Sequence, residues 1–167
     1  MFIRMKVNGI TLDPFTSMPI VILKDLKNEH ALPIWIGIAE ASAIATELEK
    51  ISLARPMTHD LLRNILGELS VTLERVEVTE LRNNTFYANI YLRTGEKVLA
   101  IDSRPSDAIA LALRTDSPIF VAEEVIRKAK KIDLGTAPND EMTEEQKERW
   151  AEILENLSPE AFGKYKM

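Results

Sequence analysis

Apolar and polar residues alternate at the start of the chain, which is the pattern of a strand with one buried face. Ile3, Met5 and Val7 are apolar, and the residues between them are polar. A period of two places successive side chains on opposite faces of a sheet. Two short apolar runs follow, over residues 21–23 and 33–37, and both indicate buried strands.

The apolar period then changes to three and four residues, which predicts two amphipathic helices. The first helix begins at Ile38, and the second follows Arg55-Pro56. The first apolar stripe consists of Ala41, Ile44, Ala45, Leu48 and Ile51, and the second of Leu61, Leu62, Ile65, Leu66 and Leu69.

Residues 71–102 have the pattern of an antiparallel meander of three strands. The turn dipeptides Asn83-Asn84 and Thr94-Gly95 separate the strands. In the first strand the apolar phase slips between Leu73 and Val76, which predicts a β-bulge or a bend. We then expect a helix over 105–114, a strand over 118–121 and a short helix over 122–131.

The end of the chain differs from the rest in charge. Residues 138–167 hold eight acidic and four basic side chains, whereas residues 1–137 hold 18 acidic and 17 basic ones. An apolar stripe that includes Trp150 and Leu154 predicts a helix there. We therefore predict an α/β domain of α+β character over residues 1–135, with helices packed on a mixed, largely antiparallel sheet. A linker and an acidic helical extension follow over 136–167.

Composition excludes several classes of protein. The chain has no cysteine, which rules out disulfide frameworks, thiolate nucleophiles and cysteine-ligated metal sites. No apolar run approaches the roughly 18 residues of a membrane span. We expect a cytoplasmic protein without a membrane partner.

The stretch DSRPSDAIALALR, residues 102–114, places charged and hydroxyl groups just before an apolar helix. Pro105 suits the first helical turn, and Asp107 can accept hydrogen bonds from free N–H groups there. Capping does not explain Asp102 and Arg104. Asp102 and Asp107 together suit a hard divalent cation such as Mg²⁺. The alternative is that Asp102 forms a structural ion pair with an arginine.

The stretch RPMTHDLL, residues 55–62, opens a helix in a similar way. His59 and Asp60 lie in its first turn and off its apolar stripe, so we expect them to be exposed or in a cleft. A histidine there is a candidate general base, although a lone exposed histidine is more often an ordinary surface residue. Glu40 is a further candidate, but a glutamate at a helix start also complements the helix dipole.

These stretches resemble the bifunctional nuclease family, whose members act on DNA and RNA. The resemblance covers essentially the whole chain. It implies an α/β domain that forms a homodimer or larger homo-oligomer, and a nuclease activity assisted by a divalent metal. The matching stretches are LPIWIGIAEASAI, RPMTHDLLRNIL, YANIYL and AIDSRPSDAIALALR followed by PIFVAEEVI.

The resemblance does not assign catalytic residues, so the predicted site follows from side-chain chemistry. Carboxylates would hold Mg²⁺ and activate water, a histidine would transfer protons, and arginines would neutralise the phosphate of a nucleic acid. The predicted metal ligands are Asp102, Asp107 and Glu40. The predicted catalytic residues are Arg55, His59, Asp60, Asp102, Arg104 and Asp107.

Two non-catalytic interpretations compete with the nuclease. One is a regulatory or scaffolding homo-oligomer, which the near-neutral body and the acidic tail favour over a nucleic-acid binder. The other is binding of an anion or small ligand at the two helix N-termini. The nuclease hypothesis requires Asp102, Asp107, Arg104, His59 and Asp60 to converge on one cleft, either within the chain or across a dimer interface.

Overall fold

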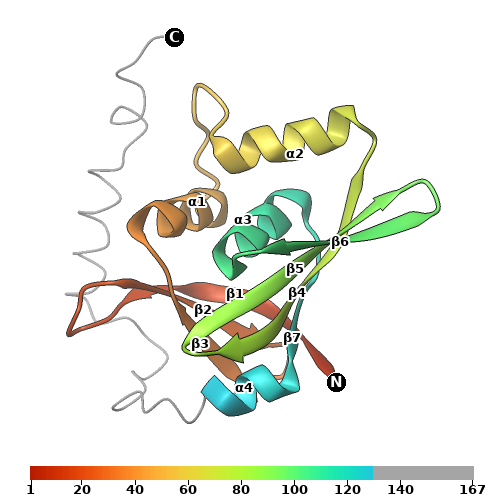
Figure 1. The fold of residues 1–167 in the computed structure, drawn as a ribbon. Helices are drawn as coiled ribbons and strands as arrows, with labels where there is room; N and C mark the ends of the chain where they lie inside the picture. Colours follow the sequence, from red (N-terminus) through yellow and green to blue (C-terminus); the bar gives the residue numbers. More distant parts are fainter. Residues whose placement is uncertain (130–167) are drawn as a thin grey trace.

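The computed structural model describes residues 1–129, which form a sheet covered by helices (Figure 1). The extension predicted over 136–167 lies outside the described residues. The strands are β1 (Phe2–Leu12), β2 (Pro19–Asp25), β3 (Ala31–Trp35), β4 (Thr72–Arg82), β5 (Thr85–Thr94), β6 (Lys97–Ser103) and β7 (Ile119–Ala122). The helices are α1 (Ile38–Leu48), α2 (Thr58–Glu68), α3 (Pro105–Thr115) and α4 (Glu123–Ala129).

The seven strands form one sheet in the order β3-β2-β1-β7-β4-β5-β6. The four-residue strand β7 lies at the centre, antiparallel to β1 and parallel to β4. Every other neighbouring pair is antiparallel. The prediction of a mixed, largely antiparallel sheet with packed helices is therefore confirmed.

The meander has the predicted strands, bulge and first turn. Asn83 and Asn84 have φ values of 52° and 57°, the left-handed pair that a tight type I′ hairpin requires. The register of β4 against β5 shifts between Leu73 and Arg75, which confirms the bulge. The second turn lies one residue later than predicted, because Thr94 pairs with Lys97 and leaves Gly95 to adopt the positive φ of 58°.

Three helices share one side of the sheet, and α4 lies at the other (Figure 1). The core forms where α1 and α3 pack against the apolar face of the central strands. Ile44 of α1, Ile109 and Leu111 of α3, and Val76 and Val121 of the sheet are fully buried there. Among residues 1–129, no helix is both long and apolar enough to cross a bilayer.

Helices α1 and α2 use their apolar stripes differently. α1 buries its stripe as far as Ala45, but Ile51, which the stripe was predicted to include, lies beyond the helix end and is 38% exposed. The chain turns away there because Lys50 adopts a left-handed φ. In α2 no residue is buried, and Ile65 and Leu69 are 45% and 67% exposed.

Candidate active site

A cleft of about 570 Å³ lies between α1, α2 and the start of α3. The apolar lining comes from α1 and the chain leading to α2, and polar groups come from all three helices. The apolar side chains are Ile38, Ala39, Ala43, Leu53 and Met57. The charged or titratable ones are Glu40, His59, Arg104, Asp107 and Arg114.

A direct contact joins the two helix openings that the sequence presents separately. His59 Nε2 lies 2.9 Å from Asp107 Oδ1, although 48 positions separate the two residues. The fold brings them together because α2 packs against α3 with both N-termini at the cleft. An ionised carboxylate only accepts hydrogen bonds, so the neutral imidazole carries its proton on Nε2. The other nitrogen, Nδ1, makes no hydrogen bond within residues 1–129.

Arg104 also contacts Asp107 and links it to Glu40, which forms a charged network with His59. Its Nε lies 2.8 Å from Asp107 Oδ2, and its Nη2 lies 3.1 Å from Asp107 Oδ1, which is a bidentate pair. Its Nη1 donates to Glu40 Oε1 of α1 at 2.8 Å. A guanidinium has five N–H groups, so two remain for a ligand. The side chain is 62% exposed and can meet one.

Glu40 reaches Arg104 because the residue that precedes α1 has no side chain. Gly37 is the N-cap of α1, and a Cβ there would collide with the Glu40 carboxylate. The φ of Gly37 is −77°, a value open to any residue, so space rather than backbone conformation explains the glycine.

Asp60 belongs to a second ion pair beside the first. Its Oδ2 accepts the Met57 backbone N–H at 3.0 Å, and its Oδ1 accepts Arg114 Nε at 2.7 Å. Arg114 comes from the far end of α3, and its side chain is only 1% exposed. Asp60 therefore caps its own helix and neutralises a buried guanidinium.

The electrostatics of the cleft favour ionised side chains. Burial raises the pKa of Asp107, but hydrogen bonds from Arg104 and His59 outweigh it and hold that pKa below its usual value. The same balance lowers the pKa of Asp60, where the Met57 N–H and Arg114 oppose burial. Hydrogen bonds to Asp107 and Glu40 raise the pKa of Arg104. These groups therefore keep their charges at neutral pH.

The start of α3 shows which groups Asp107 of the stretch DSRPSDAIALALR contacts. Pro105 occupies the first turn as predicted, and Arg104 is the N-cap residue. No side chain hydrogen-bonds to the free N–H groups of this helix start. Asp107 instead contacts Arg104 and His59, so its carboxylate belongs to the cleft rather than to helix capping.

Two predicted residues do not join this network. Asp102 pairs in the sheet with Asn89, on the face opposite to Ile101 and the buried Ile90, against which α3 packs. Strand alternation therefore directs Asp102 away from α3. Arg55 is exposed and makes no ion pair with a residue in 1–129. Within the predicted set, the fold brings His59, Arg104, Asp107 and Glu40 together, with Asp60 beside them.

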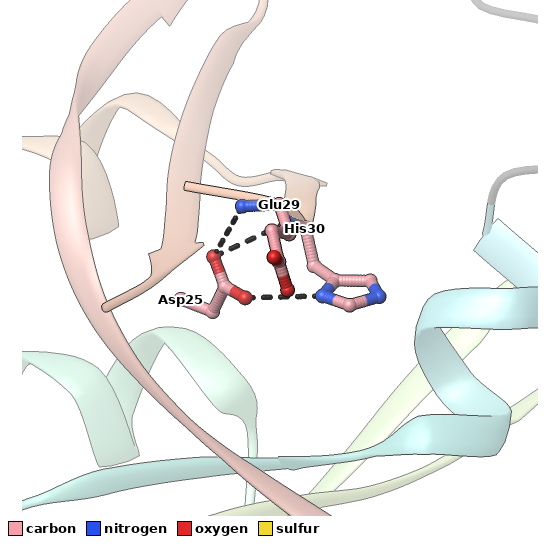
Figure 2. A group of neighbouring side chains, drawn as sticks. All are labelled: Asp25, Glu29 and His30. Carbon is pink, nitrogen blue, oxygen red and sulfur yellow. Dashed lines mark hydrogen bonds and ion pairs between the residues drawn. The ribbon is translucent and has the colours of Figure 1, made fainter. Parts of the chain in front are cut away.

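The predicted magnesium ligands do not fit a common metal position. Asp102 lies apart from the other two, and the Arg104 guanidinium links Asp107 to Glu40. Throughout residues 1–129, a single group of three histidine or acidic side chains is compact enough to hold an ion, and it lies elsewhere. Figure 2 shows this group at the β2–β3 turn: Asp25, Glu29 and His30.

Within that turn, hydrogen bonds already occupy the Asp25 carboxylate. Its Oδ1 accepts the backbone N–H groups of Glu29 and His30 at 2.8 and 3.2 Å, and its Oδ2 contacts His30 Nδ1 at 3.0 Å (Figure 2). The His30 hydrogen bond is the main reason that the pKa of Asp25 is lowered. The arrangement closes a hairpin, and nothing further indicates a ligand.

Sequence reasoning missed the role of Arg114. Arg114 is the last residue of the stretch DSRPSDAIALALR. Its apolar neighbours in the sequence indicated only the end of a helix. The signal that could have identified it is an arginine on the apolar side of a helix, because a buried charge needs a partner.

Comparison with known proteins places this chain in a family. A family model described as the bifunctional nuclease domain matches residues 21–133. The chain belongs to the bifunctional nuclease domain family. An uncharacterized protein of Mycobacterium tuberculosis is 34% identical over 162 residues, which are 95% of this chain and 97% of that protein. The range matched by the bifunctional nuclease domain includes every residue of the charged network.

Plant proteins that carry the nuclease name are more distant. Bifunctional nuclease 1 of Oryza sativa subsp. japonica is 25% identical over 109 residues, 64% of this chain and 33% of that protein. Bifunctional nuclease 2 of Arabidopsis thaliana is 28% identical over 93 residues, 54% of this chain and 28% of that protein. The matched segments are only about a third of the length of these relatives.

Proposed function

We propose that the cleft hydrolyses phosphodiester bonds of DNA and RNA. The observation that carries the proposal is the contact between His59 and Asp107 beside a partly free Arg104. The three groups provide a proton acceptor, a carboxylate that orients it, and a cation for phosphate oxygens. Membership of the bifunctional nuclease domain family, with distant relatives that carry the nuclease name, supports the same reaction.

In this proposal Arg104 and His59 act on opposite sides of the phosphate. The two unused N–H groups of Arg104 would bind its non-bridging oxygens and stabilise the charge that develops on them. Nδ1 of His59 would accept the proton of the attacking water. Arg55 precedes Met57 of the cleft wall by two residues and would contact a neighbouring phosphate. A role for Asp102 stays a prediction.

The apolar wall of the cleft suits the rest of a nucleotide. Ile38, Leu53 and Met57 line it beside the charged groups. A base or sugar can bury apolar surface there while its phosphate lies at Arg104.

The test compares purified wild type with His59→Ala on single- and double-stranded DNA and on RNA. We expect the variant to lose activity by about 100-fold or more, the usual contribution of a general base. His30→Ala is the matched control, because His30 is the second histidine, also pairs with an aspartate and lies outside the cleft. Activity that survives His59→Ala would refute the proposal, and ligand binding without turnover would favour the anion-binding alternative.

We also propose that a second copy of this chain covers the exposed apolar side chains of β6 and α2. β6 is an edge strand of the sheet within residues 1–129. Its Val98, Leu99 and Ile101 are 42%, 47% and 44% exposed. A flat apolar edge of this kind tends to pair with another strand.

β6 is complementary to itself. Antiparallel pairing about Ala100 would place Leu99 opposite the partner subunit's Ile101. The same pairing would place Lys97 opposite the partner subunit's Ser103, so no like charges would meet along the paired strands. α2 packs on α3, into which β6 leads.

Sedimentation equilibrium tests this interface. We expect a dimer for the wild type and a monomer for Leu99→Lys, because a buried unpaired charge opposes association. Leu26→Lys is the matched control, since Leu26 is 60% exposed in the β2–β3 turn. A monomeric wild type, or a dimer that survives Leu99→Lys, would contradict the proposal.

A further inference from the structure

We propose that this cleft performs its hydrolysis without a divalent metal, with Asp107 and Glu40 as positioning residues for His59 and Arg104. The inference rests on the nuclease activity proposed above and replaces the predicted role of these two carboxylates as magnesium ligands. It follows from where their oxygens lie and what they already contact.

Asp107 has little coordinating capacity left. Oδ1 accepts from His59 Nε2 at 2.9 Å and from Arg104 Nη2 at 3.1 Å, and Oδ2 accepts from Arg104 Nε at 2.8 Å. A carboxylate offers about four acceptor positions, so three are occupied. A cation would find one remaining acceptor position there, beside a guanidinium whose charge repels it.

Glu40 is committed to the same guanidinium from the other side. Its Oε1 accepts from Arg104 Nη1 at 2.8 Å, and Gly37 leaves the space that the carboxylate occupies. Arg104 therefore lies where the two carboxylates meet, which is where a cation bridging them would have to bind. A fixed positive charge at that point repels Mg²⁺ and attracts phosphate.

The third predicted ligand cannot complete a metal site with them. Asp102 faces the other side of β6, away from α3. The charges of the cleft side chains also nearly cancel: Arg104 and Arg114 oppose Asp107, Glu40 and Asp60. Uncompensated carboxylates, which attract Mg²⁺, are therefore scarce in this cleft.

The chemical step then uses the residues of the chain and water. Nδ1 of His59 takes a proton from water while the water oxygen forms a bond to phosphorus. The bond from phosphorus to the leaving oxygen breaks on the far side of the phosphorus, where that oxygen takes a proton from solvent water, and the imidazolium returns its proton to solvent. Arg104 binds the non-bridging oxygens throughout, and Asp107 holds the imidazole in the required tautomer. The products are a phosphate monoester and an alcohol.

The test assays the full-length protein, stripped of metal, in EDTA and in Mg²⁺, beside His59→Ala. We expect activity that depends on His59 to persist in EDTA within about threefold of its value in Mg²⁺, because neither the base nor the cation is a metal. Activity that depends on His59 and appears only with Mg²⁺ would overturn this inference and leave the nuclease proposal intact. No activity that depends on His59 in either buffer would refute the nuclease proposal itself.

Imidazole rescue separates a catalytic base from a structural histidine. Added imidazole can enter the space left by His59→Ala, and we expect it to restore activity about tenfold in EDTA. Arg104→Ala is the matched control and should gain nothing. Persistent activity in EDTA without rescue of His59→Ala would assign the base to another group and overturn the role given to His59.

A magnesium titration of Asp107→Asn and Glu40→Gln tests the positioning roles. We expect Asp107→Asn to lower kcat and Glu40→Gln to raise KM, with neither deficit relieved by more Mg²⁺. Melting curves establish that the variants fold. A loss that high Mg²⁺ restores would show a metal ligand and overturn the assignment.

Discussion

The protein's two histidines are each paired with an aspartate, yet the two pairs perform different tasks. His30 and Asp25 are five positions apart, and the same Asp25 carboxylate accepts two backbone N–H groups of the turn. His59 and Asp107 are 48 positions apart, and the Asp107 carboxylate binds Arg104 instead. A histidine–aspartate contact is therefore not evidence of function by itself. The other groups that the carboxylate contacts distinguish the two pairs.

Exposure of the ring supports the same distinction. The His59 side chain is 16% exposed and lines a cleft, whereas His30 is 34% exposed at the end of a hairpin. His30 uses Nδ1 toward its aspartate, and His59 uses Nε2. Only His59 combines a free ring nitrogen with a neighbouring cation and a cavity.

The largest expected difference is in activity between Asp107→Ala and Asp25→Ala. Loss of the Asp107 carboxylate removes the group that orients His59 and Arg104, and we expect nuclease activity to fall about 100-fold. Asp25→Ala should change activity less than about twofold once the protein is folded, because it touches no cleft residue. Initial rates of cleavage of one oligonucleotide measure the activity of both variants. Equal losses in the two variants would contradict the distinction.

Stability should show the reverse order in the same two variants. Asp25→Ala leaves two backbone N–H groups and His30 without their acceptor, so we expect the free energy of unfolding to fall by about 2 kcal/mol. Asp107→Ala leaves Arg104 exposed to water and still paired with Glu40, and should cost less than about 1 kcal/mol. Urea denaturation followed by circular dichroism measures both values. A larger loss at Asp107 would mean that its network mainly stabilises the fold.

A smaller effect is expected from Gly37→Ala, which disturbs the cleft without changing any charged residue. The new Cβ would displace the Glu40 carboxylate and weaken its ion pair with Arg104. We expect KM to rise about fivefold, corresponding to ~1 kcal/mol for one exposed ion pair. Gly67→Ala is the matched control, since a Cβ there meets nothing within 4 Å. Wild-type kinetics in Gly37→Ala would show that Glu40 does not position Arg104.

The smallest effect concerns acid stability at the turn. The pKa of Asp25 is lowered in the folded state, chiefly by the His30 hydrogen bond, so ionised Asp25 stabilises the fold. This contribution is complete above the unfolded pKa of about 3.9 and disappears as the pH falls through the lower folded value. Asp25→Asn should therefore lower stability at pH 6 and approach the wild type as the pH falls below the lowered folded pKa. A constant difference across that range would contradict the ionic contribution.

Local patterns predicted most of the fold. The period of two over residues 3–7 and the turn at Asn83-Asn84 depend on near neighbours, and both are confirmed. The slip between Leu73 and Val76 predicted a bulge for the same reason. The one-residue error at the second turn is also local, because glycine takes the left-handed position more readily than threonine.

The candidate site was predicted only in part. His59, Arg104, Asp107 and Glu40 were chosen as polar groups at helix starts, and the fold brings them together. Asp102 was chosen because it ends an apolar strand, but strand alternation directs it away from them. The exposure of the α2 stripe could not be predicted either, because an amphipathic pattern does not specify what covers it.

The sequence by itself determined the elements, since hydrophobic period, turn residues and proline positions act within a few residues of the chain. The tertiary structure alone decided that His59 meets Asp107, that Arg104 lies between two carboxylates, and that Asp60 neutralises the buried Arg114. These contacts join residues 48 to 64 positions apart. Such pairs form only when α1, α2 and α3 pack on one side of the sheet, because burying their shared core fixes which helix starts are neighbours.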